Sequence, residues 1–251
     1  MAELPLLRSA LLEAHGITAF FTTRQGGVSP SPFDSLNFGG GLGDDDNNIQ
    51  ANIAQLLAAT GLKSAPHQAR QEHGIAPLFC SGPGRLHEQA ADMLLTRQAG
   101  CAVAVRIADC VPILLADPET GLAAAVHAGW RGTARGIIRQ AVTHMQSHEA
   151  RTGDILACIG PCIGPCCFNV GEETAAALLS SCDDASRYIQ AKHTDLAGIN
   201  MLQLQQAGVD QSHIEQVGGC TACDSSRFFS HRRDHGRTGR HLAVVALPEA
   251  A

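Results

Sequence analysis

The chain has 251 residues, of which 45% are hydrophobic and 17% are charged. This length suits one domain or two small ones, and the composition is that of a folded globular chain, not a disordered one. The formal net charge is −6, which argues against a nucleic-acid binder that works by bulk electrostatics. A nucleotide-sized ligand held by a few arginines is compatible with this charge.

The N-terminus does not have the features of a secretory signal. It lacks a basic start, Arg8 and Glu13 interrupt its apolar run, and no small-residue cleavage site follows. No stretch reaches the roughly 18 uninterrupted apolar residues of a membrane helix. We therefore expect a cytoplasmic protein with reduced cysteines. Such thiols fill the core, bind metal or act as nucleophiles.

The first part of the chain predicts a strand, a long loop and a helix. Residues 17–23 have the composition of a buried strand. The glycine- and proline-rich segment 24–46 predicts an ordered loop, and long loops inside compact domains are usually functional. The spacing of apolar residues predicts a helix over 47–60, capped by Asn47 or Asn48 and ended by the glycine that follows.

The rest of the chain alternates between predicted strands and helices. Residues 101–116 and 122–127 predict two strands, the first interrupted at Pro112, with a turn over 117–121 between them. Such alternation predicts an α/β fold in which helices cover a mixed sheet. The further predicted elements are strands at 155–160 and 241–247 and helices at 132–148, 172–181 and 195–208.

The predicted hairpin brings a cysteine and a histidine together. If the turn at 117–121 is its centre, opposed residues have numbers that sum to about 237, which pairs Cys110 with His127. Paired residues have Cα atoms ~4.5–5.5 Å apart and side chains on one face. This distance suits a thiolate and an imidazole that share a cation, and equally a thiol and an imidazole that share a proton. Asp109, one position earlier, is expected on the opposite face of the sheet.

Several motifs in the right order resemble the YfiH/laccase-domain family, whose members are described as purine nucleoside phosphorylases and formerly as multicopper polyphenol oxidases. The resemblance covers roughly residues 20–246 and is most specific around Cys110 and His127. The matching segments are TRQGGVS at 23–29, QEHG at 71–74, ADCVPILLADP at 108–118, VHAGWRGT at 126–133, IGPCIG at 159–164, FFS at 228–230 and TGR at 238–240.

The resemblance implies a fold and an activity. It implies a four-layer α/β/β/α mixed-sheet fold, shared with toxin deamidases of the cytotoxic necrotizing factor type, in a single domain over 1–251. It also implies phosphorolysis of adenosine, inosine and S-methyl-5′-thioadenosine, and deamination of adenosine. Purine nucleosides and phosphate are then the small-molecule partners, and neither nucleic acid nor membrane is expected.

The resemblance further implies a Zn²⁺ ion held by one cysteine and two histidines, which are also the catalytic residues. Three protein ligands leave a fourth position open, as in catalytic zinc sites. A multicopper cluster is not supported, because coupled copper sites usually contain His-x-His pairs and this sequence has none. The metal ligands carried over are His73, Cys110 and His127, and the substrate-binding residues are Arg24, Asn37, Gln71 and Arg131.

Two other groups of residues have alternative interpretations. Phosphorolysis needs an anion clamp. Arg24 in the glycine-rich loop is our first candidate for it, and the basic run from Arg232 to Arg240 is either a second candidate or a solvated loop. The cysteines at 158, 162, 166 and 167, with the Cys220-x-x-Cys223 pair, resemble a structural zinc site only in part, because a second CxxC is missing. Buried thiols are the favoured interpretation.

The sequence departs from the family pattern at Glu72, Phe168, Asn169 and His231, where the family usually has Val, Tyr, Glu and Tyr. None of these differences touches the three metal ligands, and those at Phe168 and Asn169 affect expected substrate contacts. Two other functions fit the same residues. One is a metal-free hydrolase or deamidase with Cys110 as nucleophile and His127 as base. The other is a quality-control factor that acts on peptidoglycan precursors.

Overall fold

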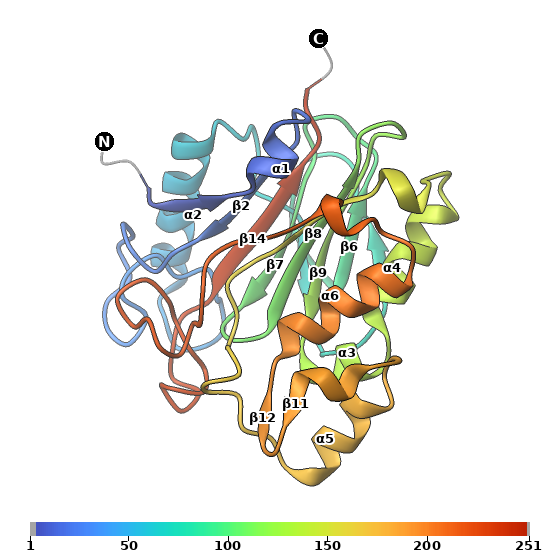
Figure 1. Ribbon diagram of the computed structural model, residues 1–251. Coiled ribbons are helices and arrows are strands. Elements are labelled where there is room, and N and C mark those ends of the chain that lie inside the picture. Colours follow the sequence, from blue (N-terminus) through green and yellow to red (C-terminus); the bar gives the residue numbers. More distant parts are fainter. Residues whose placement is uncertain (1–3, 250–251) are drawn as a thin grey trace.

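The computed structural model describes residues 4–249, and Figure 1 shows their arrangement. The helices are α1 (Ala10–Glu13), α2 (Asp46–Thr60), α3 (Trp130–Ala134), α4 (Ile137–Gln146), α5 (Glu172–Leu179) and α6 (Leu196–Gln206). The strands are β1 (Leu6–Arg8), β2 (Thr18–Thr22), β3 (Gln68–Arg70), β4 (Pro77–Phe79), β5 (Leu86–Ala90), β6 (Met93–Thr96), β7 (Ala102–Ile107), β8 (Val111–Asp117), β9 (Leu122–Ala128), β10 (Leu156–Ile159), β11 (Ile189–Gln190), β12 (His193–Thr194), β13 (Ile214–Gln216) and β14 (His241–Ala246).

Two large sheets form the centre of the described chain. One has the order β1-β2-β14-β7 and the other β13-β10-β8-β9-β6-β4. Helix α2 packs on the outer face of the first sheet, and α3 to α6 lie over the outer face of the second, on the opposite side of the molecule (Figure 1). A third core lies between the sheets. The expected four-layer α/β/β/α fold is confirmed.

Strands β8 and β9 lie in the middle of their sheet and are buried over their whole length. Leu114 and Ala125 point into the core between the sheets. Ile113 and Ala124 point toward the helices, because successive side chains of a strand alternate between faces. Burial on both faces explains why these segments are continuous apolar runs without a polar alternation.

Helix α2 confirms the predicted element but corrects its start. Its N-cap is Asp45, whose carboxylate accepts a hydrogen bond from the N–H of Asn47 at 2.8 Å. Asn47 and Asn48 are therefore not caps, since both lie inside the first turn. Gly61 ends the helix in the left-handed conformation with φ +75°, as predicted.

Two other boundaries also differ from the prediction. The helix expected over 132–148 is divided into α3 and α4 by Gly136, which has φ +73°. The strand expected over 101–116 is interrupted at residues 108–110 and not at Pro112, which pairs with His127 inside the ladder. No helix within residues 4–249 combines the length and the apolar character that a membrane span requires.

The predicted hairpin exists, but its register differs by two residues. Asp117 pairs with Leu122, and Val111 pairs with Ala128. Asp117 therefore belongs to β8, and its carboxylate accepts the N–H groups of Glu119 and Thr120 in the loop that follows. The prediction that Cys110 is directly opposite His127 is wrong, because Asp117 is the last residue of the strand and not the first residue of the turn.

Candidate active site

A cavity of about 540 Å³ opens where β7 ends and β8 begins. Its walls come from segments that lie far apart in the sequence, including the loop before α2, the loop after β3, the first turn of α3, the loop after β10 and the loop before β14. Five of the residues predicted for the site line this cavity: His73, Cys110, His127, Gln71 and Arg131.

His73, Cys110 and His127 form one group. One side-chain donor atom from each lies within 4.8 Å of the others. His127 lies near the end of β9, Cys110 immediately precedes β8, and His73 lies after β3 with φ 58°. The proximity predicted for Cys110 and His127 therefore exists although the register was wrong, since Cys110 lies just outside the ladder.

Asp92 holds this group together from behind. Its Oδ1 accepts a hydrogen bond from His127 Nδ1 at 2.7 Å, and its two oxygens also accept the backbone N–H groups of Glu72, His73 and Gly74. The residue is 1% exposed. Sequence reasoning missed Asp92, because a single aspartate before a short strand carries no motif.

The Cys110 thiol and the buried His127 imidazole favour their charged forms in each other's presence. Burial raises the pKa of Cys110, but the two histidines that face it lower the pKa to about 6. Burial lowers the pKa of His127, but Cys110 and Asp92 raise it to about 9. Cys110 is therefore a thiolate near neutral pH. His127 donates from Nδ1 to Asp92, which leaves its Nε2 facing Cys110 and His73.

The close packing of this group requires a glycine beside it. A Cβ atom at Gly129 would lie 2.7 Å from a carbon of the His73 ring and 3.1 Å from Cys110 Sγ. Glycine is therefore required at position 129 because a larger residue would collide with His73 and Cys110. Its backbone angles do not require glycine, since its φ is −70°.

Four arginines line the same cavity: Arg106, Arg131, Arg232 and Arg240. Within residues 4–249, Arg106 and Arg240 form no ion pair with a carboxylate. Burial lowers the pKa of both guanidinium groups, and the charge of Arg240 lowers that of Arg106 further. The charges of Cys110 and Asp109 act in the opposite direction on the pKa of Arg240, but neither group forms a close ion pair with it. Two partly buried cations without a close ion pair make this wall suited to bind an anion.

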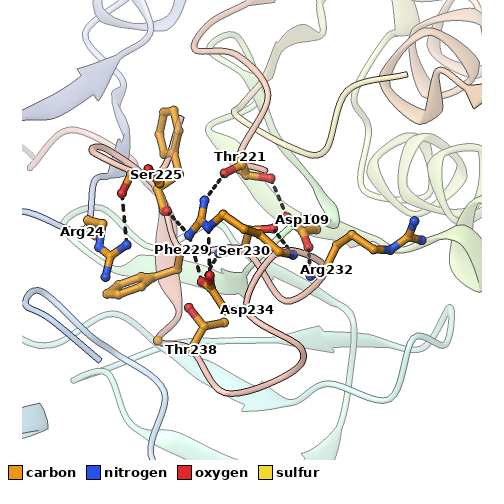
Figure 2. Close-up of polar contacts among 12 residues, drawn as sticks. Arg24, Asp109, Thr221, Ser225, Phe229, Ser230, Arg232, Asp234 and Thr238 are labelled. Carbon is orange, nitrogen blue, oxygen red and sulfur yellow. Dashed lines mark hydrogen bonds and ion pairs between the residues drawn. The ribbon is translucent and has the colours of Figure 1, made fainter. Parts of the chain in front are cut away.

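Arg24 and Asn37 do not line the cavity. Arg24 donates to the Asp34 carbonyl and carboxylate and to the Ser225 carbonyl, and Figure 2 shows it directed toward Ser225. Asn37 is fully buried and bonds to Asp44 and to the N–H of Arg240. Both side chains thus fix loops, and the arginines that line this cavity are the four named above and not Arg24.

Asp109 corrects another expectation. It is not on a regular strand but has φ 90°, and it lines the cavity. Its carboxylate accepts the Thr221 hydroxyl at 2.6 Å and the N–H of Arg232 at 2.7 Å (Figure 2). Asp109 therefore connects three segments at the cavity wall.

The other predicted contacts have mixed outcomes. Gln71 lines the cavity, but its amide is engaged on both sides by the backbone of Arg106, at 2.8 Å each. Of the departures from the family pattern, Phe168 and His231 line the cavity with Trp130, whereas Glu72 and Asn169 are not among its lining residues.

The cysteines do not all behave as buried thiols. Cys158 and Cys162 are buried, as expected. Cys166 and Cys223 are exposed, and with Cys167 and Cys220 their sulfur atoms gather within 4.8 Å of one another. The preference for buried thiols is therefore wrong for this second group.

Comparison with known proteins places these features in a family. Residues 18–248 match the family model described as "Multi-copper polyphenol oxidoreductase laccase". The purine nucleoside phosphorylase of Deinococcus radiodurans is 38% identical over 251 residues, covering 98% of this chain and 94% of the relative. The purine nucleoside phosphorylase YfiH of Escherichia coli is 36% identical over 236 residues, covering 92% and 94%.

Solved structures agree in fold over nearly the whole chain. The hypothetical protein YfiH of Bacillus licheniformis has a TM-score of 0.89 and 31% identity, covering 98% of this chain and 97% of the other. YlmD of Geobacillus stearothermophilus has a TM-score of 0.84 and 33% identity, covering 99% and 98%. The chain therefore belongs to the laccase-like YfiH family.

Proposed function

We propose that this protein is a zinc-dependent purine nucleoside phosphorylase that also deaminates adenosine and acts in the cytoplasm. The named activity of its relatives supports the first part. One observation supports the proposal most directly. A single cavity contains the metal-binding side chains His73, Cys110 and His127 together with arginines that form no ion pair with a carboxylate. This combination suits a reaction with two substrates, a nucleoside and phosphate.

The donor set fits Zn²⁺. Two imidazoles and one thiolate are ordinary zinc ligands, and Asp92 orients His127 so that only Nε2 faces the group. Copper fits less well, because a His₂Cys copper site usually adds an axial methionine, and no methionine is among the cavity-lining residues of the described chain. A zinc ion with an open fourth position supplies a Lewis acid and lowers the pKa of a bound water.

The chain's own residues supply binding and orientation. Arg106 and Arg240 offset the two charges of phosphate and hold it against the ribose. Trp130 and Phe168 supply aromatic surface for the purine base, beside Arg131 and Arg232, which lie over one face of each ring. Asp109 holds the loop of Arg232 in place by accepting that residue's N–H, which keeps the cavity wall ordered.

The test is product analysis of adenosine and inosine with and without phosphate. We expect free base and ribose 1-phosphate only with phosphate, and inosine from adenosine in either condition. Cys110→Ser should abolish both reactions while the fold is retained, because a serine hydroxyl is a poor zinc ligand at neutral pH. Normal turnover by this variant, or no turnover of either nucleoside by the zinc-loaded wild type, would refute the proposal.

One observation favours a second candidate. Asp92, His127 and Cys110 form a chain in which a carboxylate orients an imidazole beside a thiolate, as in a cysteine hydrolase or deamidase. Removal of metal with a chelator separates the two functions. The zinc enzyme loses activity and recovers it with Zn²⁺, whereas a cysteine hydrolase keeps its activity. Turnover of a peptidoglycan precursor and not of nucleosides would identify the quality-control alternative.

A further inference from the structure

We propose that Cys166, Cys167, Cys220 and Cys223 form a second metal site, which binds Zn²⁺ through four thiolates and has a structural role. These residues are called the four-cysteine cluster below. The site is separate from the candidate active site and does not depend on the proposed reaction.

The geometry of the four-cysteine cluster is close to that of a tetrahedral zinc site. Its four sulfur atoms lie within 4.8 Å of one another, and Cys223 Sγ is 3.4 Å from both Cys166 Sγ and Cys167 Sγ. With zinc–sulfur bonds of ~2.3 Å, a tetrahedron places its sulfurs about 3.8 Å apart. Small side-chain rotations therefore suffice to enclose an ion.

The backbone near Cys220 holds the sulfur of this residue in a fixed orientation. The N–H of Gly164 donates to Cys220 Sγ at 3.2 Å. Such N–H···S contacts fix the orientation of a thiolate ligand before metal arrives. Cys220 and Cys223 also have the two-residue spacing that zinc sites commonly use.

The two loops that carry the thiols are already tied together. Residues Cys162 and Cys220 form a parallel bridge, and the N–H of Thr221 donates to the Cys162 carbonyl at 2.9 Å. Arg232 donates to the Cys167 carbonyl and Arg233 to the Thr221 carbonyl. Arg233 is paired with Asp234 and holds the second loop, whereas Arg232 lies beside Cys167 and offsets part of the negative charge that four thiolates bring to a divalent cation.

Packing alone does not explain the four-cysteine cluster. Two of its thiols are exposed, so they are not core fillers, and the contacts between them are weak thiol hydrogen bonds. A second donor group, His67, Cys80 and His87, is different. Its two imidazoles bond directly to each other, Nδ1 to Nε2, at 2.8 Å, and so satisfy one another without an ion.

A metal here has a clear structural consequence for the cavity. The first loop continues into Phe168, and the second holds Asp109 through the Thr221 hydroxyl. An ion that joins the loops therefore stabilises one wall of the candidate active site. The protein would supply all four ligands of the ion, as in structural zinc sites, which leave no coordination position open.

Zinc content per chain tests the proposal, measured by elemental analysis and native mass spectrometry on the full chain purified under reducing conditions. We expect about two ions in the wild type, one in Cys166→Ser/Cys223→Ser, one in His73→Ala, and none when these substitutions are combined. Cys182→Ser, a half-buried cysteine outside the cluster, is the matched control and keeps both ions. His87→Ala should also keep both.

A spectroscopic measurement on the wild type covers the case in which the double variant does not fold. Replacement of zinc by Co²⁺ should give a sulfur-to-metal absorption band that four thiolates make several-fold stronger than one thiolate alone. The proposal is overturned by one ion per chain with the double variant unchanged, by loss of the second ion in His87→Ala, or by a disulfide between Cys223 and Cys166 or Cys167 in the reduced preparation.

Discussion

Asp92 shows how a single residue organises the candidate active site. It accepts four hydrogen bonds, one from His127 and three from the backbone that carries His73. Burial raises the pKa of Asp92, but these donors lower it below its ordinary value, so the carboxylate is charged. The same anion thus sets the tautomer of one candidate ligand and the backbone position of another.

Asp92→Asn should weaken zinc binding by about 10–100-fold, because loss of a carboxylate partner behind a metal-bound histidine has effects of this size. A neutral amide also no longer fixes the proton on His127 Nδ1. The measurement is competition for zinc with a chromophoric chelator. Asp154→Asn, at an exposed ion pair, is the control and should bind as the wild type does. Equal affinity in both variants would contradict the role assigned to Asp92.

We expect the loss of Arg240, and not of Arg24, to weaken the binding of phosphate. Arg240→Gln should raise the KM for phosphate about 10–100-fold, the cost of one charge-assisted contact of ~1.5–3 kcal/mol. Deamination of adenosine without phosphate should change little in the same variant. Steady-state kinetics in varied phosphate distinguish the two effects. Equal losses in both reactions would mean that Arg240 holds the nucleoside or the fold.

At the level of elements, strong patterns were predictable and pairing details were not. The helix over 47–60 and the strands over 17–23 and 241–247 follow from apolar runs of adequate length. Strands such as β3 and β11 have three and two residues, which is too short for a periodic signal. The hairpin register differed by two, because Asp117 has a turn-forming side chain yet pairs with Leu122 as the last residue of its strand.

The start of α2 gives a direct test of an element boundary. Asp45→Ala should lower the free energy of unfolding by ~1 kcal/mol, since it removes the side chain that caps the helix. Asn47→Ala, at the position expected from the sequence, should change it by less than ~0.5 kcal/mol because this residue is exposed within the first turn. Urea unfolding of both variants is the measurement, and the opposite ranking would restore Asn47 as the cap.

At the level of the whole molecule, the fold brings distant residues into one cavity. His73, Cys110 and Arg240 come from three separate parts of the chain, and β14 returns beside β7 to place the last of them. No local sequence pattern predicts such a long-range contact, so only the resemblance to the YfiH/laccase-domain family linked His73 to Cys110. It gave no indication of Arg106, because this arginine lies in an ordinary buried strand.

The stability of the whole molecule should depend on pH through His241. This residue is fully buried at the start of β14, where Nε2 accepts the N–H of Phe229 at 2.8 Å. Burial lowers the pKa of His241 to about 3, from an ordinary value near 6.5. Between these values the unfolded chain binds a proton that the folded chain does not. Stability from this group is therefore complete above pH ~6.5 and falls as the pH drops toward 3, by up to ~1.4 kcal/mol per pH unit.

His241→Asn should accordingly be less stable than the wild type at pH 7 but lose less stability on acidification. An asparagine oxygen accepts a hydrogen bond from Phe229 without a titrating ring, so the difference between the two proteins narrows as the pH falls from 6.5 to 4. Carboxylates such as Asp92 also lose stability in acid, but they do so in both proteins and cancel in the difference. Urea unfolding at several pH values measures it, with His15→Asn at an exposed position as the control. Parallel curves for wild type and His241→Asn would show that His241 is not the group that couples folding to pH.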